Sequence, residues 1–121
     1  MLVKLFLLNR LWDKISQTNF NERSQMHLPF KNIWNMIKII LFVDSSLLDG
    51  FTIWASLNGT LLLDYTKSNN LVCTFNISED KFSVYYGEYA LAYAYKADSG
   101  KFSLKTIEQH IKDFKTEYEQ L

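Results

Sequence analysis

Few side chains in this sequence are of the types that perform acid–base, nucleophilic or metal chemistry. The two histidines are His27, in a polar segment, and His110, beside an apolar stripe near the end. His27 has no cysteine or acidic residue at the spacing of a metal site, and His110 lies beside the apolar stripe of the last predicted helix, so we interpret both as solvated or rim histidines. The turn carboxylates have no spacing that requires them to converge for acid–base catalysis. The sequence therefore predicts a protein that is not an enzyme, with no catalytic residue, metal site or cofactor.

The cysteine, glycine and charge content indicate the cellular compartment and exclude some classes of partner. Cys73 is the only cysteine, which excludes an intramolecular disulfide and favours a reducing compartment, so we expect a cytoplasmic protein. The four glycines are isolated and form no phosphate-binding loop. Thirteen basic and thirteen acidic residues give zero formal charge, which argues against a nucleic-acid partner. No apolar run reaches the roughly 20 residues of a membrane span, so no membrane partner is expected either.

The elements that position these residues follow from apolar periodicity. The length fits a single domain over 1–121. Steps of three and four between apolar residues predict two N-terminal helices, over about 3–16 and 30–42, and a C-terminal helix over about 104–119. The predicted stripes are Met1, Leu5, Leu8, Trp12 and Ile15 in the first helix, Phe30, Ile33, Ile37 and Ile40 in the second, and Ile107, Ile111, Phe114, Tyr118 and Leu121 in the last.

Between the second and third helices the apolar period changes to two, which indicates strands. Polar turn segments divide this region into five strands joined as an antiparallel meander over about 51–95. The predicted strands are 51–57, 60–66, 71–77, 82–86 and 89–95. The fold class is therefore α+β.

Loop lengths set the register of this sheet. If Asn58-Gly59 forms a two-residue hairpin, Trp54 lies opposite Leu63, and a four-residue turn at 67–70 then places Leu62 opposite Phe75. One face collects mostly apolar side chains, with Asp64 as the exception. We expect the second N-terminal helix and the C-terminal helix to cover this face. Cys73 is predicted to be buried on it and chemically inert. Most of the five tyrosines within 85–95 are interpreted as core lining on the same face, because aromatic alternation in strands is normally packing.

The opposite face of the sheet carries an apolar ridge of Trp54, Leu63, Tyr65 and Tyr85, with Thr74 in the same row. A five-stranded sheet has room for two helices on one face, so the N-terminal helix has no assigned place. It either folds under the sheet and buries Trp54, or leaves the ridge free for another chain. An exposed apolar patch of this kind usually marks an interaction site.

Four segments resemble small prokaryotic accessory proteins, including toxin-neutralising immunity proteins, that combine a sheet meander with a closing helix. The segments are LLDGF, LNGTLLLDY, FNISEDKFSVYYG and FSLKTIEQHIKDF, and they span about residues 48–118. The resemblance implies a bacterial cytoplasmic protein that acts by occupying a partner and has no catalytic residues.

We therefore expect a non-enzymatic protein-binding module, an immunity or inhibitor protein that neutralises a toxin or effector. The acidic turn at 78–80, with Glu88, would steer a basic partner. The alternatives are a homodimeric structural or accessory protein that pairs through the same ridge and, less favoured, a small-ligand-binding domain. The predicted partner-binding residues are Trp54, Leu63, Tyr65, Thr74, Tyr85, Glu79, Asp80 and Glu88.

Overall fold

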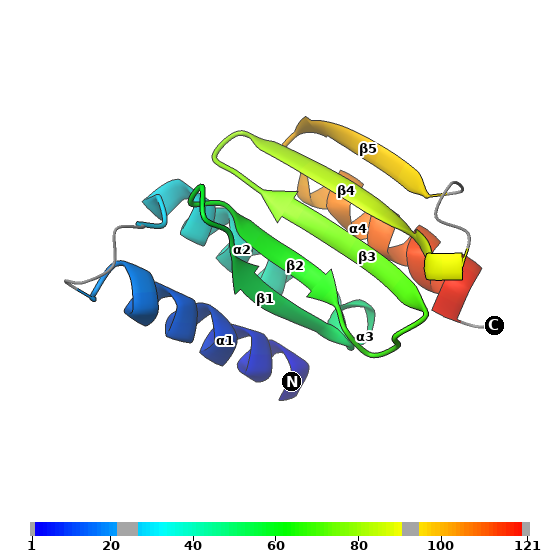
Figure 1. Cartoon of the computed structure of the whole chain (residues 1–121), viewed down its shortest axis with the longest axis horizontal. Helices are drawn as coiled ribbons and strands as arrows, with labels where there is room; N and C mark the ends of the chain where they lie inside the picture. The colour runs from blue at the N-terminus through cyan, green and yellow to red at the C-terminus, as the bar shows by residue number, and fades with distance from the viewer. Residues whose placement is uncertain (1, 22–26, 91–94, 120–121) are drawn as a thin grey trace.

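The computed structural model of the chain describes residues 2–21, 27–90 and 95–119. It has the predicted α+β class, with one five-stranded antiparallel sheet in the order β1-β2-β3-β4-β5 (Figure 1). The helices are α1 (Leu2–Thr18), α2 (Phe30–Phe42), α3 (Ser45–Leu48) and α4 (Leu104–Phe114), which continues into a short π-helical turn, η2 (Lys115–Glu119). The strands are β1 (Phe51–Ala55), β2 (Leu61–Tyr65), β3 (Leu71–Ile77), β4 (Lys81–Glu88) and β5 (Lys96–Lys101).

One face of the sheet is covered by helices, as predicted. Helices α2 and α4 lie behind the sheet in Figure 1, and the core fills the space between the two layers. The stripe predicted for the last helix is confirmed where it is described, because Ile107, Ile111 and Phe114 are fully buried. They pack with buried side chains of the central strands, such as Phe75. Ser103 accepts a hydrogen bond from the Thr106 amide (3.2 Å) and caps the start of α4, also as expected.

The stripe predicted for the first helix is correct only in part, because Leu8 and Ile15 are partly buried against the core and Met1 lies outside the described residues. The buried leucines of α1 are Leu7 and Leu11, whereas Leu5 and Trp12 are 54% and 58% exposed. Helix α1 lies alongside β1 at the edge of the sheet (Figure 1). Since this helix carries two apolar stripes, periodicity alone could not tell which of them faces the core. The same holds in α2, where Phe30 is 80% exposed although it was placed on the core face.

Strand β2 is shifted by one residue from the predicted register on both of its sides. Trp54 pairs with Leu62 and not with Leu63, and Leu63 pairs with Phe75. A one-residue shift moves every side chain of a strand to the other face of the sheet. Because the two shifts compensate, β1, β3 and β4 keep their predicted faces and only β2 is inverted.

The β1–β2 hairpin explains the first shift. Ser56 and Thr60 close the loop through an amide-to-carbonyl bond of 2.9 Å, so the loop contains three residues, 57–59. A two-residue type I′ turn needs positive φ at both central residues. Here Gly59 has a φ of +86° and Asn58 does not have a positive φ. The side chain of Asn58 instead accepts a hydrogen bond from the Thr60 hydroxyl (2.9 Å), which stabilises the longer turn.

The inversion of β2 removes the one polar exception from the core face. Leu61, Leu63 and Tyr65 are buried among the core residues. Asp64 lies on the opposite face, where it accepts a hydrogen bond from the Thr74 hydroxyl at 2.7 Å. The core face of the sheet is thus more completely apolar than the predicted register made it.

The fifth strand is Lys96–Lys101, and the predicted strand over 89–95 is wrong. Strand β4 continues to Glu88 without a turn because β3 offers it partners over its full length, and Tyr86 pairs with Lys96. Residues 91–94, which belong to the predicted strand, lie outside the described residues. The lysines at both ends of β5 are a common feature of exposed sheet edges, where they disfavour pairing with other strands.

Candidate protein-binding surface

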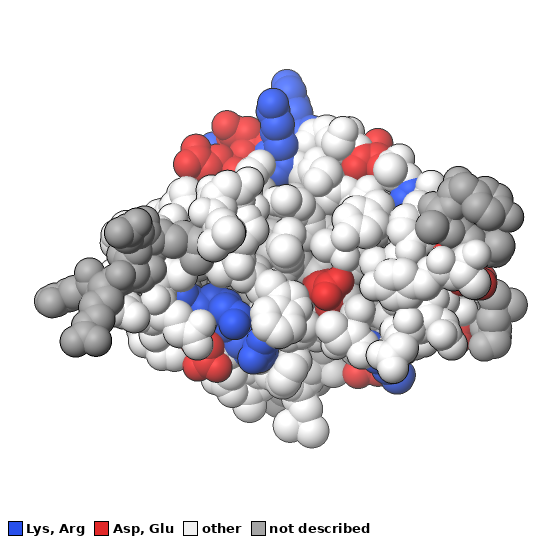
Figure 2. Space-filling model, in the orientation of Figure 1, with Lys and Arg blue, Asp and Glu red and all other residues white. Residues whose placement is uncertain are grey.

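The face of the sheet turned away from α2 and α4 is the best candidate surface for binding. No helix among the described residues lies over it, and Figure 2 shows it as mostly uncharged. Trp54 and Tyr85 both point to this side and are 43% and 45% exposed. We call it the open sheet face. By strand alternation, it comprises Thr52, Trp54, Leu62, Asp64, Val72, Thr74, Asn76, Ser83 and Tyr85.

Two cations of α1 lie over the Trp54 ring. The Arg10 guanidinium carbon is 5.1 Å and the Lys14 ammonium nitrogen is 5.0 Å from the ring centroid, both within cation–π range. Arg10 Nε also donates to the Thr52 hydroxyl at 3.2 Å. The first helix therefore does not fold under the sheet to bury Trp54. It packs beside β1, reaches Trp54 only with these side chains, and leaves this face open, which is the second of the two expected positions. The sequence reasoning missed both cations because nothing in periodicity gives the packing position of α1.

Polar residues occupy the centre of the open sheet face, between Trp54 and Tyr85. Thr74 is buried and donates to Asp64, and both lie in the cross-strand row that ends at Tyr85. Three strand spacings separate β1 from β4, or roughly 14 Å between the strands that carry Trp54 and Tyr85. The two aromatic side chains therefore flank a polar centre, an arrangement that suits a protein partner better than a small ligand.

The ring of Tyr85 packs against another aromatic ring on the side of the sheet where β5 lies. The ring of Tyr95 stacks beside it, with centroids 6.2 Å apart and an interplanar angle of 19°. Tyr95 reaches this position over Gly87, where an added Cβ would lie 2.5 Å from the Tyr95 ring. Tyr95 was placed on the core face by the wrong fifth strand, and the structure puts it on the open side. A hollow of about 520 Å³ on the surface of β4 and β5 is lined in part by Tyr85 and is large enough for a partner's side chain.

Leu63 and Tyr65, predicted on the exposed ridge, lie in the core, and that placement is wrong. Leu63 is fully buried, and the Tyr65 ring packs edge-on against Phe51 and Phe114 at 5.5 and 5.0 Å. The Tyr65 hydroxyl donates to Glu119 at 2.7 Å. The cause is the three-residue hairpin, which turns these side chains of β2 inward.

The acidic turn does not form an acidic surface. Asp80 pairs with Lys31 at 2.6 Å, and the pKa of each group is shifted to favour its charged form by this contact. The hollow beside this turn is lined by both acids and by more cations: Lys31, Lys38, Lys81 and Lys101 accompany Glu79 and Asp80. Glu88 is at the other end of β4, roughly 23 Å away by strand rise. These three acidic residues are therefore not brought together.

One histidine has a carboxylate partner. His110 Nε2 lies 2.7 Å from Asp98, which ties α4 to the edge strand and lowers the pKa of the Asp98 carboxyl. The ring lies beside Phe82 and Tyr86, and its Nδ1 is buried with no hydrogen-bond partner among the described residues. His110 lines none of the hollows described here. Its partner Asp98 lines the hollow beside Tyr85, whereas His110 itself does not.

The thiol of Cys73 is expected to be unreactive in the folded protein. Cys73 is fully buried on the core face, and burial raises the pKa of its thiol well above the ordinary value. We expect a thiol reagent such as Ellman's reagent to leave the folded protein unmodified at pH 8 and to titrate one thiol after unfolding in guanidinium chloride. Stoichiometric labelling of the folded protein within minutes would show that this site is open.

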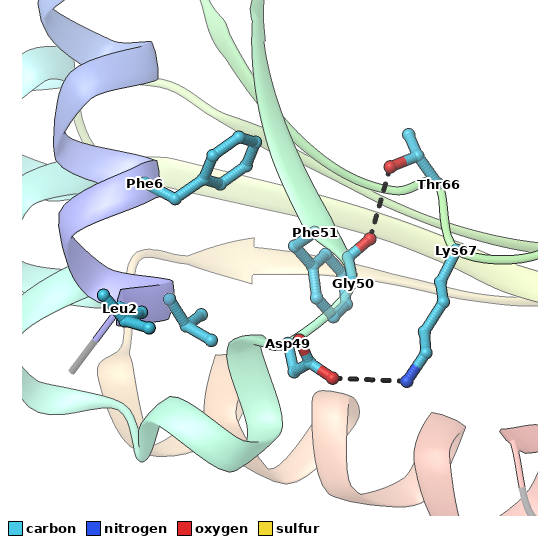
Figure 3. A pocket seen from close by; sticks show the side chains of 8 residues that line it. Leu2, Phe6, Asp49, Gly50, Phe51, Thr66 and Lys67 are labelled. Atoms are coloured by element: carbon cyan, nitrogen blue, oxygen red, sulfur yellow. Dashed lines mark hydrogen bonds and ion pairs between the residues drawn. The ribbon is translucent and has the colours of Figure 1, made fainter.

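An apolar hollow of about 430 Å³ lies at the start of α1 (Figure 3). Leu2 and Phe6 approach it from the helix, and Phe51 lies opposite. Its main charged groups, Asp49 and Lys67, pair with each other at 3.2 Å. Since these polar groups are already satisfied, the hollow offers little to orient a small ligand, and it gives the ligand-binding alternative no support.

Within the described ranges, no group of three His, Cys, Asp or Glu side chains is placed to hold a metal ion. Among the helices of those same residues, none has the length and apolar character needed to cross a membrane. Comparison with protein-family models, with curated proteins and with solved structures gives no match to this chain.

Proposed function

We propose that this chain is a non-enzymatic protein-binding module, an immunity or inhibitor protein of the cytoplasm that neutralises a toxin or effector by occupying it. The observation that carries the proposal is the open sheet face, on which Trp54 and Tyr85 are each nearly half exposed. Tryptophan and tyrosine are the side chains that most often dominate the energy of protein interfaces. Thr74 and Asp64 supply a hydrogen-bonded polar centre between them.

The charges near Trp54 indicate the chemistry of the partner. Arg10 and Lys14 lie over the ring, so the cations and the aromatic anchor form one site. A complementary surface would present an apolar pocket bordered by carboxylates, because opposite charges across an interface accelerate encounter and fix orientation. Steering by the acidic turn is not part of this proposal, since Asp80 is paired with Lys31. We therefore propose a partner that is acidic where it meets Trp54.

The test begins with tagged chain expressed in its own host, followed by mass spectrometry of the protein that co-purifies and calorimetry with the purified pair. We expect Trp54→Ala and Tyr85→Ala each to weaken binding by roughly tenfold or more, because each truncates an interface anchor. Trp34→Ala is the matched control, since Trp34 is 48% exposed but lies on α2, away from the open sheet face.

The fold of each variant is checked by circular dichroism. If the Trp54 and Tyr85 variants stay folded and bind within twofold of the wild type, the open sheet face is not the binding surface.

A further inference from the structure

Helix α1 presents a second apolar stripe to solvent. Leu5, Leu8, Trp12 and Ile15 follow one another by three and four residues and so lie on one side of the helix. The core-facing side is a different one, marked by Leu7 and Leu11. Leu8 and Ile15 are partly buried at the base of the outward stripe, whereas Leu5 and Trp12 are more than half exposed.

Helix α2 has the same property in stronger form. Nine of its thirteen residues are apolar, and Phe30, Trp34, Ile37 and Leu41 form an outward stripe by steps of four, three and four. Phe30 is 80% exposed, and Trp34 and Leu41 are each 48% exposed. An apolar side of a helix is normally buried against another part of the protein. The single chain buries only one side of α2.

The two stripes lie next to each other. The Lys4 ammonium group donates to the Leu41 carbonyl at 2.8 Å, which places the start of α1 beside the end of α2. At the other end, Asn19 exchanges two hydrogen bonds with the backbone of Leu28, at 2.7 and 3.0 Å. We call the resulting surface the helix face. Its exposed members are Leu5, Trp12, Phe20, Phe30, Trp34 and Leu41.

The helix face is large enough for a stable contact. Its four aromatic side chains, at roughly 200 Å² each and exposed by 48–80%, leave roughly 500 Å² uncovered before the leucines are counted. That is near the upper limit of apolar patches on monomeric proteins. Two such faces together would bury roughly 1,000 Å² from aromatic groups alone, which reaches the size of a specific interface.

The positions of the lysines and the arginine of α1 and α2 indicate that a second copy of the chain, and not an anionic lipid surface, covers the helix face. Lys4 is bound to a carbonyl, Lys31 pairs with Asp80, and Lys38 lies 5.0 Å from the centre of the Phe102 ring. Arg10 and Lys14 lie over Trp54 on the open sheet face. These side chains are engaged elsewhere, so a helix face could meet its own copy without like-charge repulsion. Because Arg10 and Lys14 lie on the open sheet face, and Lys4, Lys31 and Lys38 already have partners, the helix face lacks the free cations with which a membrane-surface helix binds lipid headgroups.

We infer that two copies of this chain pair through their helix faces in an isologous dimer. A twofold axis would place the α1–α2 pair of one copy against that of the other, forming a four-helix layer in which the outward stripes become buried. The open sheet faces lie elsewhere on the molecule and stay free in such a dimer. Each dimer would then present two copies of the Trp54 surface, so this inference adds to the proposed function without depending on it.

Sedimentation velocity of the full chain from about 1 to 100 μM tests the inference. We expect the wild type to shift from monomer to dimer, and Trp34→Ser and Phe30→Glu each to weaken the dimer by tenfold or more. Trp54→Ser is the matched control and should leave the dimer unchanged. Circular dichroism identifies any variant that fails to fold, and the second variant then decides.

Three results would overturn the inference. One is a wild type that is monomeric at every concentration, and another is a dimer broken by Trp54→Ser and not by the helix-face variants. The third is a monomer that co-sediments with vesicles containing phosphatidylglycerol and loses that binding in Trp34→Ser, which would assign the helix face to a lipid surface.

Discussion

Leu63→Asp is expected to unfold the protein, whereas Leu62→Asp is expected to leave it folded. Leu63 is fully buried between Ile53 and Phe75 on neighbouring strands, so the substitution buries a carboxylate without a partner. The loss of the leucine and the desolvation of the charge together cost about 5 kcal/mol or more, comparable to the whole free energy of unfolding of a small domain. Leu62 faces the open side of the sheet, where the change should cost about 1 kcal/mol.

Far-UV circular dichroism and urea denaturation of the two variants measure this difference. The comparison tests the register directly, because a two-residue hairpin at Asn58-Gly59 would exchange the roles of the two leucines. An unfolded Leu62→Asp beside a folded Leu63→Asp would show that β2 faces the other way.

Phe75→Ala is expected to reduce the free energy of unfolding by about 3–5 kcal/mol. Phe75 is fully buried in β3, the central strand, and contributes one of the largest side chains of the core. Truncation removes the apolar contacts of the ring and leaves a cavity that neighbouring strands cannot fill. The matched control is Phe42→Ala, since Phe42 is 68% exposed at the end of α2 and lies outside the helix face.

Urea denaturation monitored by circular dichroism gives both values, and the control should change stability by less than about 1 kcal/mol. A loss below 1 kcal/mol at Phe75 would mean that the sheet and the helices do not pack around this ring.

Much of the fold could be predicted from local patterns. The last helix combines an N-cap at Ser103 with an apolar stripe on one side only, so periodicity had a single solution there. The β3–β4 turn was also correct, with Ile77 opposite Phe82 and Phe75 opposite Val84. In both cases local chemistry and burial favour the same arrangement.

Other features depended on contacts that the sequence does not encode locally. The sequence Asn58-Gly59 suits a two-residue or a three-residue loop, and one residue decides which face Leu63 occupies. Helix α1 has two apolar stripes, and the burial of Leu7 and Leu11 comes from packing beside β1. Asp64 on the core face was the one signal that the register was wrong.

The candidate site was predicted in part. Trp54, Thr74 and Tyr85 share the open sheet face as expected, because β1, β3 and β4 kept their alternation. Leu63 and Tyr65 do not belong to this face, because the register of β2 differs from the predicted one. Arg10 and Lys14 were not predicted as part of the site, because the sequence does not show where α1 packs. The nine apolar residues among the thirteen of α2 were a usable signal for the helix face, because they exceed what one core-facing stripe needs, but they were interpreted only as core.

Hydroxyl-radical footprinting of the chain, free and in complex with its co-purified partner, tests most directly the claim that a partner binds the open sheet face. We expect Trp54 and Tyr85 to be oxidised readily in the free chain and to be protected in the complex, with Phe75 protected in both. Unchanged oxidation of Trp54 and Tyr85 in the complex would contradict the claim.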